Sequence, residues 1–209
     1  TSLPRSQARE SLAALVDGGQ VLVLDGRTGG EIPESSYLVT RSGWSALRER
    51  LENLLADFHR QYPLRAGMPR EEVKSRLARH IADLSPRLFN EIAGRALAEG
   101  WLAEGGTASD RLRLASHEVK LQPAQQRAVD ELLRTFRREP YTTPSVAQVE
   151  ERVGSDVLSA LLEQGRLIRL GEDVLLLAET YEEMRDAIVT HLKEHGTVTV
   201  AQVRDMFGT

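Results

Sequence analysis

The chain has 209 residues, of which 41% are hydrophobic and 28% are charged, and its formal net charge is −4. This length favours two or three small domains with apolar cores over one large domain. The absence of cysteine excludes a disulfide framework and cysteine-ligated metal sites. No apolar run is long enough to span a membrane, and the first residues lack the apolar core of a secretory signal. We therefore expect no membrane contact and a cytoplasmic location.

One pattern occurs three times along the chain. A predicted helix ends near Gly19, Gly100 or Gly165, and glycine is the residue best able to take the left-handed conformation that stops a helix. Each glycine is followed by two short apolar runs that can pair as a β-hairpin: 21–25 with 36–40, 101–105 with 111–115, and 166–170 with 174–178. A helix followed by a hairpin is the final part of a winged helix-turn-helix unit.

An internal sequence match extends the pattern toward the end of the chain. Residues 145–154 (SVAQVEERVG) align without gaps onto residues 199–208 (TVAQVRDMFG). A Ser or Thr followed three residues later by Gln predicts a capping box, in which the hydroxyl caps the helix and the Gln side chain reaches back. Both stretches are therefore expected to form short second helices of winged units.

The predicted fold class is mainly α with small β-hairpins (α+β), arranged as elongated tandem winged-helix domains. The first winged helix, at 1–42, is expected to be incomplete at its amino terminus, because the helix at 6–17 has the position of a third helix. The second winged helix covers 43–120 and the third covers 121–178. Residues 179–209 would form the first two helices of a truncated fourth, so we expect the chain to be a fragment cut at both ends.

A specific family resemblance begins at residues 55–76, LADFHRQYPLRAGMPREEVKSR. This stretch resembles the second winged-helix domain of the bacterial selenocysteine-specific elongation factors, the SelB family. The residues that carry the match are Phe58, His59, Tyr62, Pro63, Leu64, Arg65, Gly67, Arg70, Glu71 and Glu72. The stretches LQPAQQRAVDELLRTFR and GTVTVAQVRDMFGT look similar to the family's third domain and the start of its fourth, whereas the first unit matches only in general form.

The resemblance implies a role in translation, in selenocysteine incorporation at UGA codons. In the family, an amino-terminal GTPase body binds GTP and selenocysteyl-tRNA, and the fourth winged helix binds an mRNA hairpin beside the recoded codon. Residues 1–178 would then be a monomeric arm between that body and the hairpin-binding domain, and ribosome contacts would belong to the parent protein. This sequence ends before the family's Ser-Arg-Lys run, so we expect weak hairpin binding. The fragment is not expected to be an enzyme or to bind a cofactor.

Candidate RNA contacts come from the basic residues near the resemblance and near the chain's end. Arg65 and Arg70 lie in the stretch 41–80, which carries nine Lys/Arg against five Asp/Glu. Lys193 and Arg204 are the basic candidates in the fourth unit, where 181–209 has three Lys/Arg against five Asp/Glu. For all four residues the alternative is a solvated surface charge. Core packing of Phe58 and Tyr62 is the structural interpretation of the same motif.

The sequence leaves two alternative functions open. The third helices contain few basic residues, which argues against a tandem winged-helix DNA-binding regulator, and a protein-interaction scaffold is the second alternative. His191 and His195 are spaced to face one ion, yet no third ligand follows a recognisable pattern, so no metal site is predicted. The glycine-rich stretch 25–31 lacks the Lys-Ser/Thr of a phosphate-binding loop and is interpreted as a wing tip.

Overall fold

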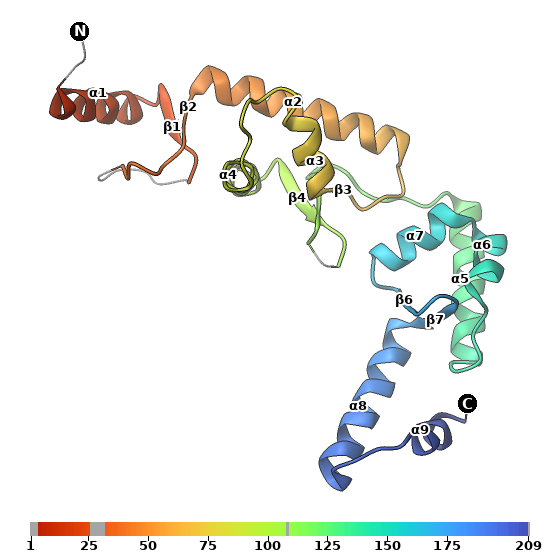
Figure 1. The fold of residues 1–209 in the computed structure, drawn as a ribbon. Helices are drawn as coiled ribbons and strands as arrows, with labels where there is room; N and C mark the ends of the chain where they lie inside the picture. The colour runs from red at the N-terminus through yellow and green to blue at the C-terminus, as the bar shows by residue number, and fades with distance from the viewer. Residues whose placement is uncertain (1–3, 26–31, 108, 209) are drawn as a thin grey trace. The chain divides into compact units, whose positions relative to one another are not determined.

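The computed structural model describes residues 4–25, 32–107 and 109–208 (Figure 1). Most of the predicted wing tip at 25–31 lies outside these residues. The chain divides into two compact units, which we name the amino-terminal unit (residues 1–61 and 67–117) and the carboxy-terminal unit (residues 62–66 and 118–209). The finer division into four winged domains stays a prediction.

The amino-terminal unit alternates helices with short antiparallel strands. Its elements are α1 (Arg5–Asp17), β1 (Val21–Val23), β2 (Leu38–Thr40), α2 (Arg41–Gln61), β3 (Met68–Pro69), α3 (Arg70–Leu77), α4 (Pro86–Ala98), β4 (Leu102–Gly105) and β5 (Arg111–Leu114). Strands β1 and β2 form one hairpin, and β4 and β5 form the second. The α+β fold class with small antiparallel sheets, consistent with winged helices, is confirmed.

Strand β3 was not predicted from the sequence. It is two residues long and pairs with β5, so the sheet has the order β3-β5-β4. A close backbone approach at Gly67 makes this pairing possible, since a Cβ at that position would lie 2.7 Å from the carbonyl oxygen of Leu112. Glycine is needed here for space, because its φ angle is not in the left-handed region.

The glycines that follow the helices confirm the predicted stops. Gly19, Gly100 and Gly165 have φ angles of 66°, 76° and 66°. The backbone N–H of each bonds to a carbonyl three residues earlier, which closes the helix before the chain enters its hairpin.

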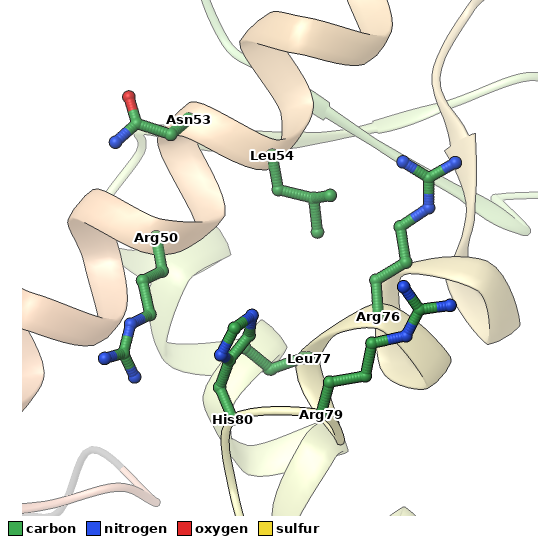
Figure 2. A pocket seen from close by; sticks show the side chains of 7 residues that line it. All are labelled: Arg50, Asn53, Leu54, Arg76, Leu77, Arg79 and His80. Atoms are coloured by element: carbon green, nitrogen blue, oxygen red, sulfur yellow. The ribbon is translucent and has the colours of Figure 1, made fainter.

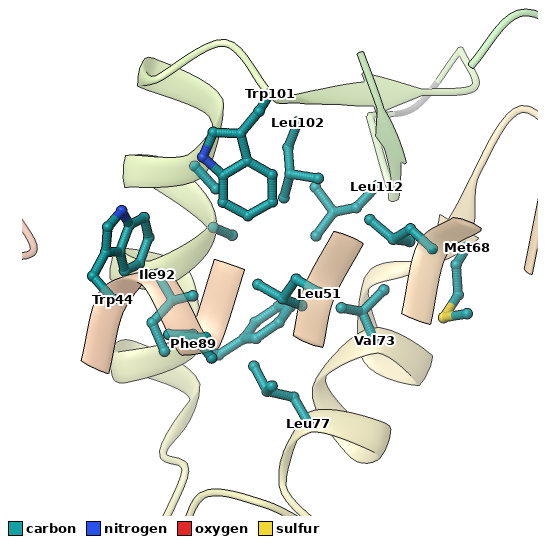
Figure 3. Packing of buried hydrophobic residues seen from close by; sticks show 14 of the residues in the cluster. Trp44, Leu51, Met68, Val73, Leu77, Phe89, Ile92, Trp101, Leu102 and Leu112 are labelled. Carbon is teal, nitrogen blue, oxygen red and sulfur yellow. The ribbon is translucent and has the colours of Figure 1, made fainter. Parts of the chain in front are cut away.

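Helix α2 supplies much of the core of the amino-terminal unit (Figure 3). Its buried apolar residues recur at helical spacing: Trp44, Leu47, Leu51, Leu55 and Phe58. They pack with Met68 of β3, with Val73 and Leu77 of α3, and with residues of α4 and the second hairpin. Leu22, Tyr37 and Val39 of the first hairpin pack against this same core. The segments predicted as first and second winged helices therefore share one apolar cluster in the structure.

The carboxy-terminal unit has the element order expected of a winged helix, followed by two further helices. The elements are α5 (Pro123–Arg138), α6 (Val146–Val153), α7 (Ser155–Glu163), β6 (Leu167–Leu170), β7 (Val174–Leu177), α8 (Ala178–His195) and α9 (Val200–Phe207). Both predicted capping boxes are present, at Ser145 with Gln148 and at Thr199 with Gln202. Helix α8 begins at Ala178, directly after β7.

The core of the carboxy-terminal unit is aliphatic apart from Phe136. The leucine pattern of the sequence predicts that Leu161, Leu162, Leu167 and Leu175 line this core. Leu161, Leu167 and Leu175 are at most 1% exposed, which confirms the prediction for them. For Leu162 the prediction is corrected, because this side chain is only partly buried at the edge of the cluster. Neighbouring helical residues point about 100° apart, so Leu161 and Leu162 cannot both face the centre of the same core.

Candidate nucleic-acid interface

Helices α4 and α7 occupy the position that enters a nucleic-acid groove in helix-turn-helix proteins. Helix α7 contains no Lys or Arg and has Asp156 in its first turn. Helix α4 has two arginines, and both are engaged inside the amino-terminal unit. The Nε of Arg95 donates to Glu99 at 2.9 Å and its Nη1 donates to the carbonyl of Val23 at 2.9 Å. The guanidinium of Arg87 lies 5.7 Å from the ring centre of Tyr37.

A short segment of the same chain contacts α7. Residues 62–66 belong to the carboxy-terminal unit, and Leu64 packs against its core. The guanidinium Nη1 of Arg65 donates to Glu163 at 2.9 Å, and the backbone N–H of Ala66 donates to the second carboxylate oxygen at 2.7 Å. The Glu163 side chain is only 9% exposed. Arg65, a candidate RNA contact, is thus held in an ion pair with α7.

Arg70 also has protein partners. It starts α3, and its backbone N–H bonds to the carbonyl of Asp110 at 2.9 Å. Its guanidinium lies 3.7 Å from a carboxylate oxygen of Glu104 and 5.9 Å from the ring centre of Phe89, and the side chain is 26% exposed. These contacts favour a structural role in holding α3 against the wing. An RNA contact through Arg70 stays a prediction.

The fourth-unit candidates lie on separate helices. Lys193 is in the last turn of α8 and Arg204 is in the last turn of α9, and both are exposed. The rings of His191 and His195 stack at 4.2 Å in the same last turns of α8. Among the described residues, no group of three or more His, Cys, Asp or Glu is arranged to hold a metal ion.

The family-like motif at the end of α2 has a buried histidine. Phe58 is buried as predicted, whereas Tyr62 is 40% exposed, so its predicted core packing is wrong; α2 ends at Gln61 and the tyrosine lies beyond it. His59 accepts a hydrogen bond at Nε2 from the backbone N–H of Leu114 at 3.3 Å. Its ring stacks on His117 at 3.6 Å. Burial lowers the pKa of His59 to about 4, and the electrostatic effects of His117 and Arg113 contribute to the same shift. The ring is therefore neutral at pH 7.

A second polar cluster joins the two tryptophans of the chain. Glu99 accepts hydrogen bonds from the indole N–H of Trp44 and of Trp101, both at 3.0 Å, and it also accepts from Arg95. Burial alone would raise the pKa of Glu99, but the two indole hydrogen bonds and the Arg95 guanidinium outweigh burial and lower it. The carboxylate therefore stays charged and fixes both indoles at the edge of the core.

The sequence did not reveal one candidate site, a pocket lined by basic residues. A pocket of about 460 Å³ opens between α2 and the end of α3, and Figure 2 shows the residues that line it: Arg50, Asn53, Leu54, Arg76, Leu77, Arg79 and His80. The basic surplus of the stretch 41–80 was the available signal, although it did not single out these residues.

These features define a winged-helix protein in which helices α4 and α7 are engaged by residues of the chain itself. Residues 53–108, about a quarter of the 209 residues, match a family model described as "Elongation factor SelB, winged helix". The match runs from within α2 to beyond β4, and this segment is similar to the winged-helix domain that the family model describes. A search of curated proteins found no match. No helix in the described part of the chain is long and apolar enough to cross a membrane.

Proposed function

We propose that this chain is part of a cytoplasmic selenocysteine-specific elongation factor. In this proposal its winged units form the arm between a GTP- and selenocysteyl-tRNA-binding body and an mRNA-hairpin-binding domain that starts with α8 and α9. The observation that carries the proposal is the SelB winged-helix match over 53–108, which covers α3 and α4 together with the core residues they share with α2.

The contacts of the third helices support an arm over a DNA-binding regulator. A groove-reading helix presents several free Arg, Lys, Asn or Gln side chains to phosphates and base edges. Here α7 contains no Arg or Lys. Its Glu163 side chain accepts hydrogen bonds from the Arg65 guanidinium and from the backbone N–H of Ala66. Helix α4 uses Arg95 to bond Glu99 and the first hairpin. Such a helix stabilises the unit and leaves little basic surface for a groove.

A chimaera tests the proposal. Residues 1–178 would replace the corresponding winged-helix region of a SelB protein, and readthrough of a UGA codon followed by a selenocysteine-insertion hairpin would be measured in cells. We expect selenocysteine-dependent readthrough to be retained, with a reporter that carries a disrupted hairpin as the control. A chimaera that is folded and abundant but gives only control-level readthrough would count against an arm function.

Duplex DNA provides the test of the alternative function. The regulator hypothesis requires tight, sequence-specific DNA binding, which a selection from random duplexes would reveal. We expect no enriched sequence, because neither α4 nor α7 presents several free basic side chains. Recovery of a defined binding motif would favour the regulator.

A further inference from the structure

The pocket between α2 and α3 carries an excess of positive charge, part of which is not paired with carboxylates of the chain. Three arginines line it, and no carboxylate does. Two acids of α2 are paired elsewhere, Glu52 with Arg48 at 2.8 Å and Asp57 with Arg60, and the third nearby acid, Glu49, does not line the pocket. Among the described residues, neither Arg50 nor Arg79 forms an ion pair, and both side chains are exposed.

The pocket has a firm apolar floor. Leu77 is 2% exposed and belongs to the core cluster of the amino-terminal unit, and Leu54 packs against that cluster. In Figure 2 the guanidinium groups lie around the rim, with Leu54 and Leu77 between them. Arg50, Asn53 and Leu54 are spaced i, i+3 and i+4, so one face of α2 provides one wall. A concave site with a fixed floor and adjustable cationic rim suits a bulky, solvated anion.

The end of α3 is a potential obstacle to an anion, since the carboxy-terminal end of a helix carries partial negative charge. Here part of that charge is compensated by the chain that follows. The backbone N–H groups of Ala78 and His80 bond to the carbonyls of Lys74 and Leu77, both at 2.9 Å. Arg76 neutralises Glu72 at 2.5 Å, which leaves Arg50 and Arg79 as the free cations. Two full charges outweigh the remaining partial charge of the helix end.

We propose that this pocket binds a backbone phosphate of structured RNA. Arg50 and Arg79 would contact the phosphate oxygens, because guanidinium groups bind phosphate with paired hydrogen bonds. Asn53, one turn from Arg50 on the same face, would hydrogen-bond the adjacent ribose 2′-hydroxyl, which distinguishes RNA from DNA. Phe, Tyr and Trp are absent from the lining, in which His80 is the one aromatic side chain, so we expect binding to the RNA backbone with little sequence preference.

The choice of RNA rests on the proposed function in translation, whereas the phosphate chemistry rests on the pocket alone. The test measures binding of a fluorescent, base-paired RNA hairpin of arbitrary sequence over a series of KCl concentrations. Each phosphate contact contributes about 1 to the slope of log K against log salt concentration. Because both arginines would contact the same phosphate, the R50A/R79A chain should lose about 1 from that slope and bind more weakly than the natural sequence.

The matched control is R134A/R152A, which removes the same charge from two exposed arginines outside the pocket that, among the described residues, form no ion pair. It should keep the salt slope near that of the natural sequence. N53A should narrow the preference for RNA over a DNA hairpin of the same sequence. Circular dichroism verifies that each variant is folded.

Three results would overturn the proposal. The first is an equal loss of slope in both double variants, which would leave only delocalised charge. The second is equal affinity for the RNA and DNA hairpins. The third is complete displacement of RNA by millimolar inorganic phosphate, which would indicate a free-anion site. None of these three results depends on readthrough by the chimaera. A failure of the proposed pocket is therefore distinguishable from a failure of the proposed arm function.

Discussion

The two compact units stabilise their interiors in different ways. The core of the amino-terminal unit is bordered by polar groups, with His59 buried beside it and Glu99 bonded to both indoles. The core cluster of the carboxy-terminal unit consists of aliphatic side chains and Phe136. Burial of aliphatic area does not depend on protonation, whereas the contributions of a buried histidine and of a carboxylate hydrogen-bonded to both indoles do. The difference predicts that acid affects the first unit more than the second.

Both tryptophans lie in the amino-terminal unit, at positions 44 and 101. Indole fluorescence therefore reports on that unit alone, while the helical circular dichroism signal reports on both. This allows the two interiors to be compared in one chain without separating them.

The largest expected effect is in the aliphatic core. Leu161→Ala should lower the free energy of unfolding by about 2–5 kcal/mol, because a fully buried leucine is replaced by a cavity. Leu162→Ala is the matched control and should cost less, since Leu162 is only partly buried. Urea unfolding followed by circular dichroism measures both. Equal costs would show that α7 packs differently, and an equal shift of the indole signal in Leu161→Ala would show that the units unfold as one.

The second effect is the response of the amino-terminal unit to acid. The pKa of His59 is about 4 in the folded chain against an ordinary value of 6.5. As pH falls below 6.5, His59 is protonated in the unfolded chain but stays neutral in the folded chain. Stability is therefore lost between about pH 6.5 and pH 4. The full loss is at most about 3 kcal/mol.

The measurement is the urea midpoint of indole fluorescence at pH 7 and pH 5. His59→Gln should reduce the difference between the two midpoints, because glutamine keeps a hydrogen-bond acceptor for the Leu114 amide and cannot be protonated. A midpoint difference that is the same in His59→Gln as in the natural sequence would assign the acid sensitivity to other groups.

A smaller effect is expected at the carboxylate between the indoles. Glu99→Gln should cost about 1–3 kcal/mol, because three hydrogen bonds to a charged group become bonds to a neutral amide. The lowered pKa of Glu99 implies that its contribution is complete above the ordinary pKa of a glutamate and fades as pH falls through the lower folded value. Glu104→Gln, at an exposed carboxylate 3.7 Å from Arg70, is the control and should change stability by less than about 1 kcal/mol. Similar losses of stability in Glu99→Gln and Glu104→Gln would show that the hydrogen bonds to the indoles stabilise the amino-terminal unit no more than an exposed ion pair does.

The sequence was informative where local chemistry decides the structure. Glycine stops, capping boxes and the 3.6-residue pattern depend on a few neighbouring residues, and all three were confirmed, for example at Gly165 and Ser145. Strand β3 was missed because two residues, one of them a proline, show no periodicity. Its existence depends on tertiary pairing with β5.

The candidate site was less predictable for the same reason. Arg65 and Glu163 are 98 positions apart, so the sequence could not show that this arginine is already paired. The pocket combines residues of 50–54 with residues of 76–80, and only the fold brings these two turns together. Local charge excess indicated the region, whereas the choice among its arginines needed the ion pairs.

The smallest effect is expected at the carboxy-terminal helices, which differ from the basic pocket in the sign of their charge. Residues 181–209 carry an excess of two acids, and phosphate is repelled by such a surface. Lys193→Ala combined with Arg204→Ala should therefore leave binding to a selenocysteine-insertion hairpin nearly unchanged, and binding by this chain should be weak and not specific for the hairpin loop. Recognition of an RNA loop needs a surface that stacks or hydrogen-bonds splayed bases, in addition to positive charge. A salt titration with the hairpin and a loop-scrambled version measures both properties. Tight binding that discriminates the loop, and that is lost in the double variant, would place the hairpin site on α8 and α9 and reverse the contrast with the pocket of the amino-terminal unit.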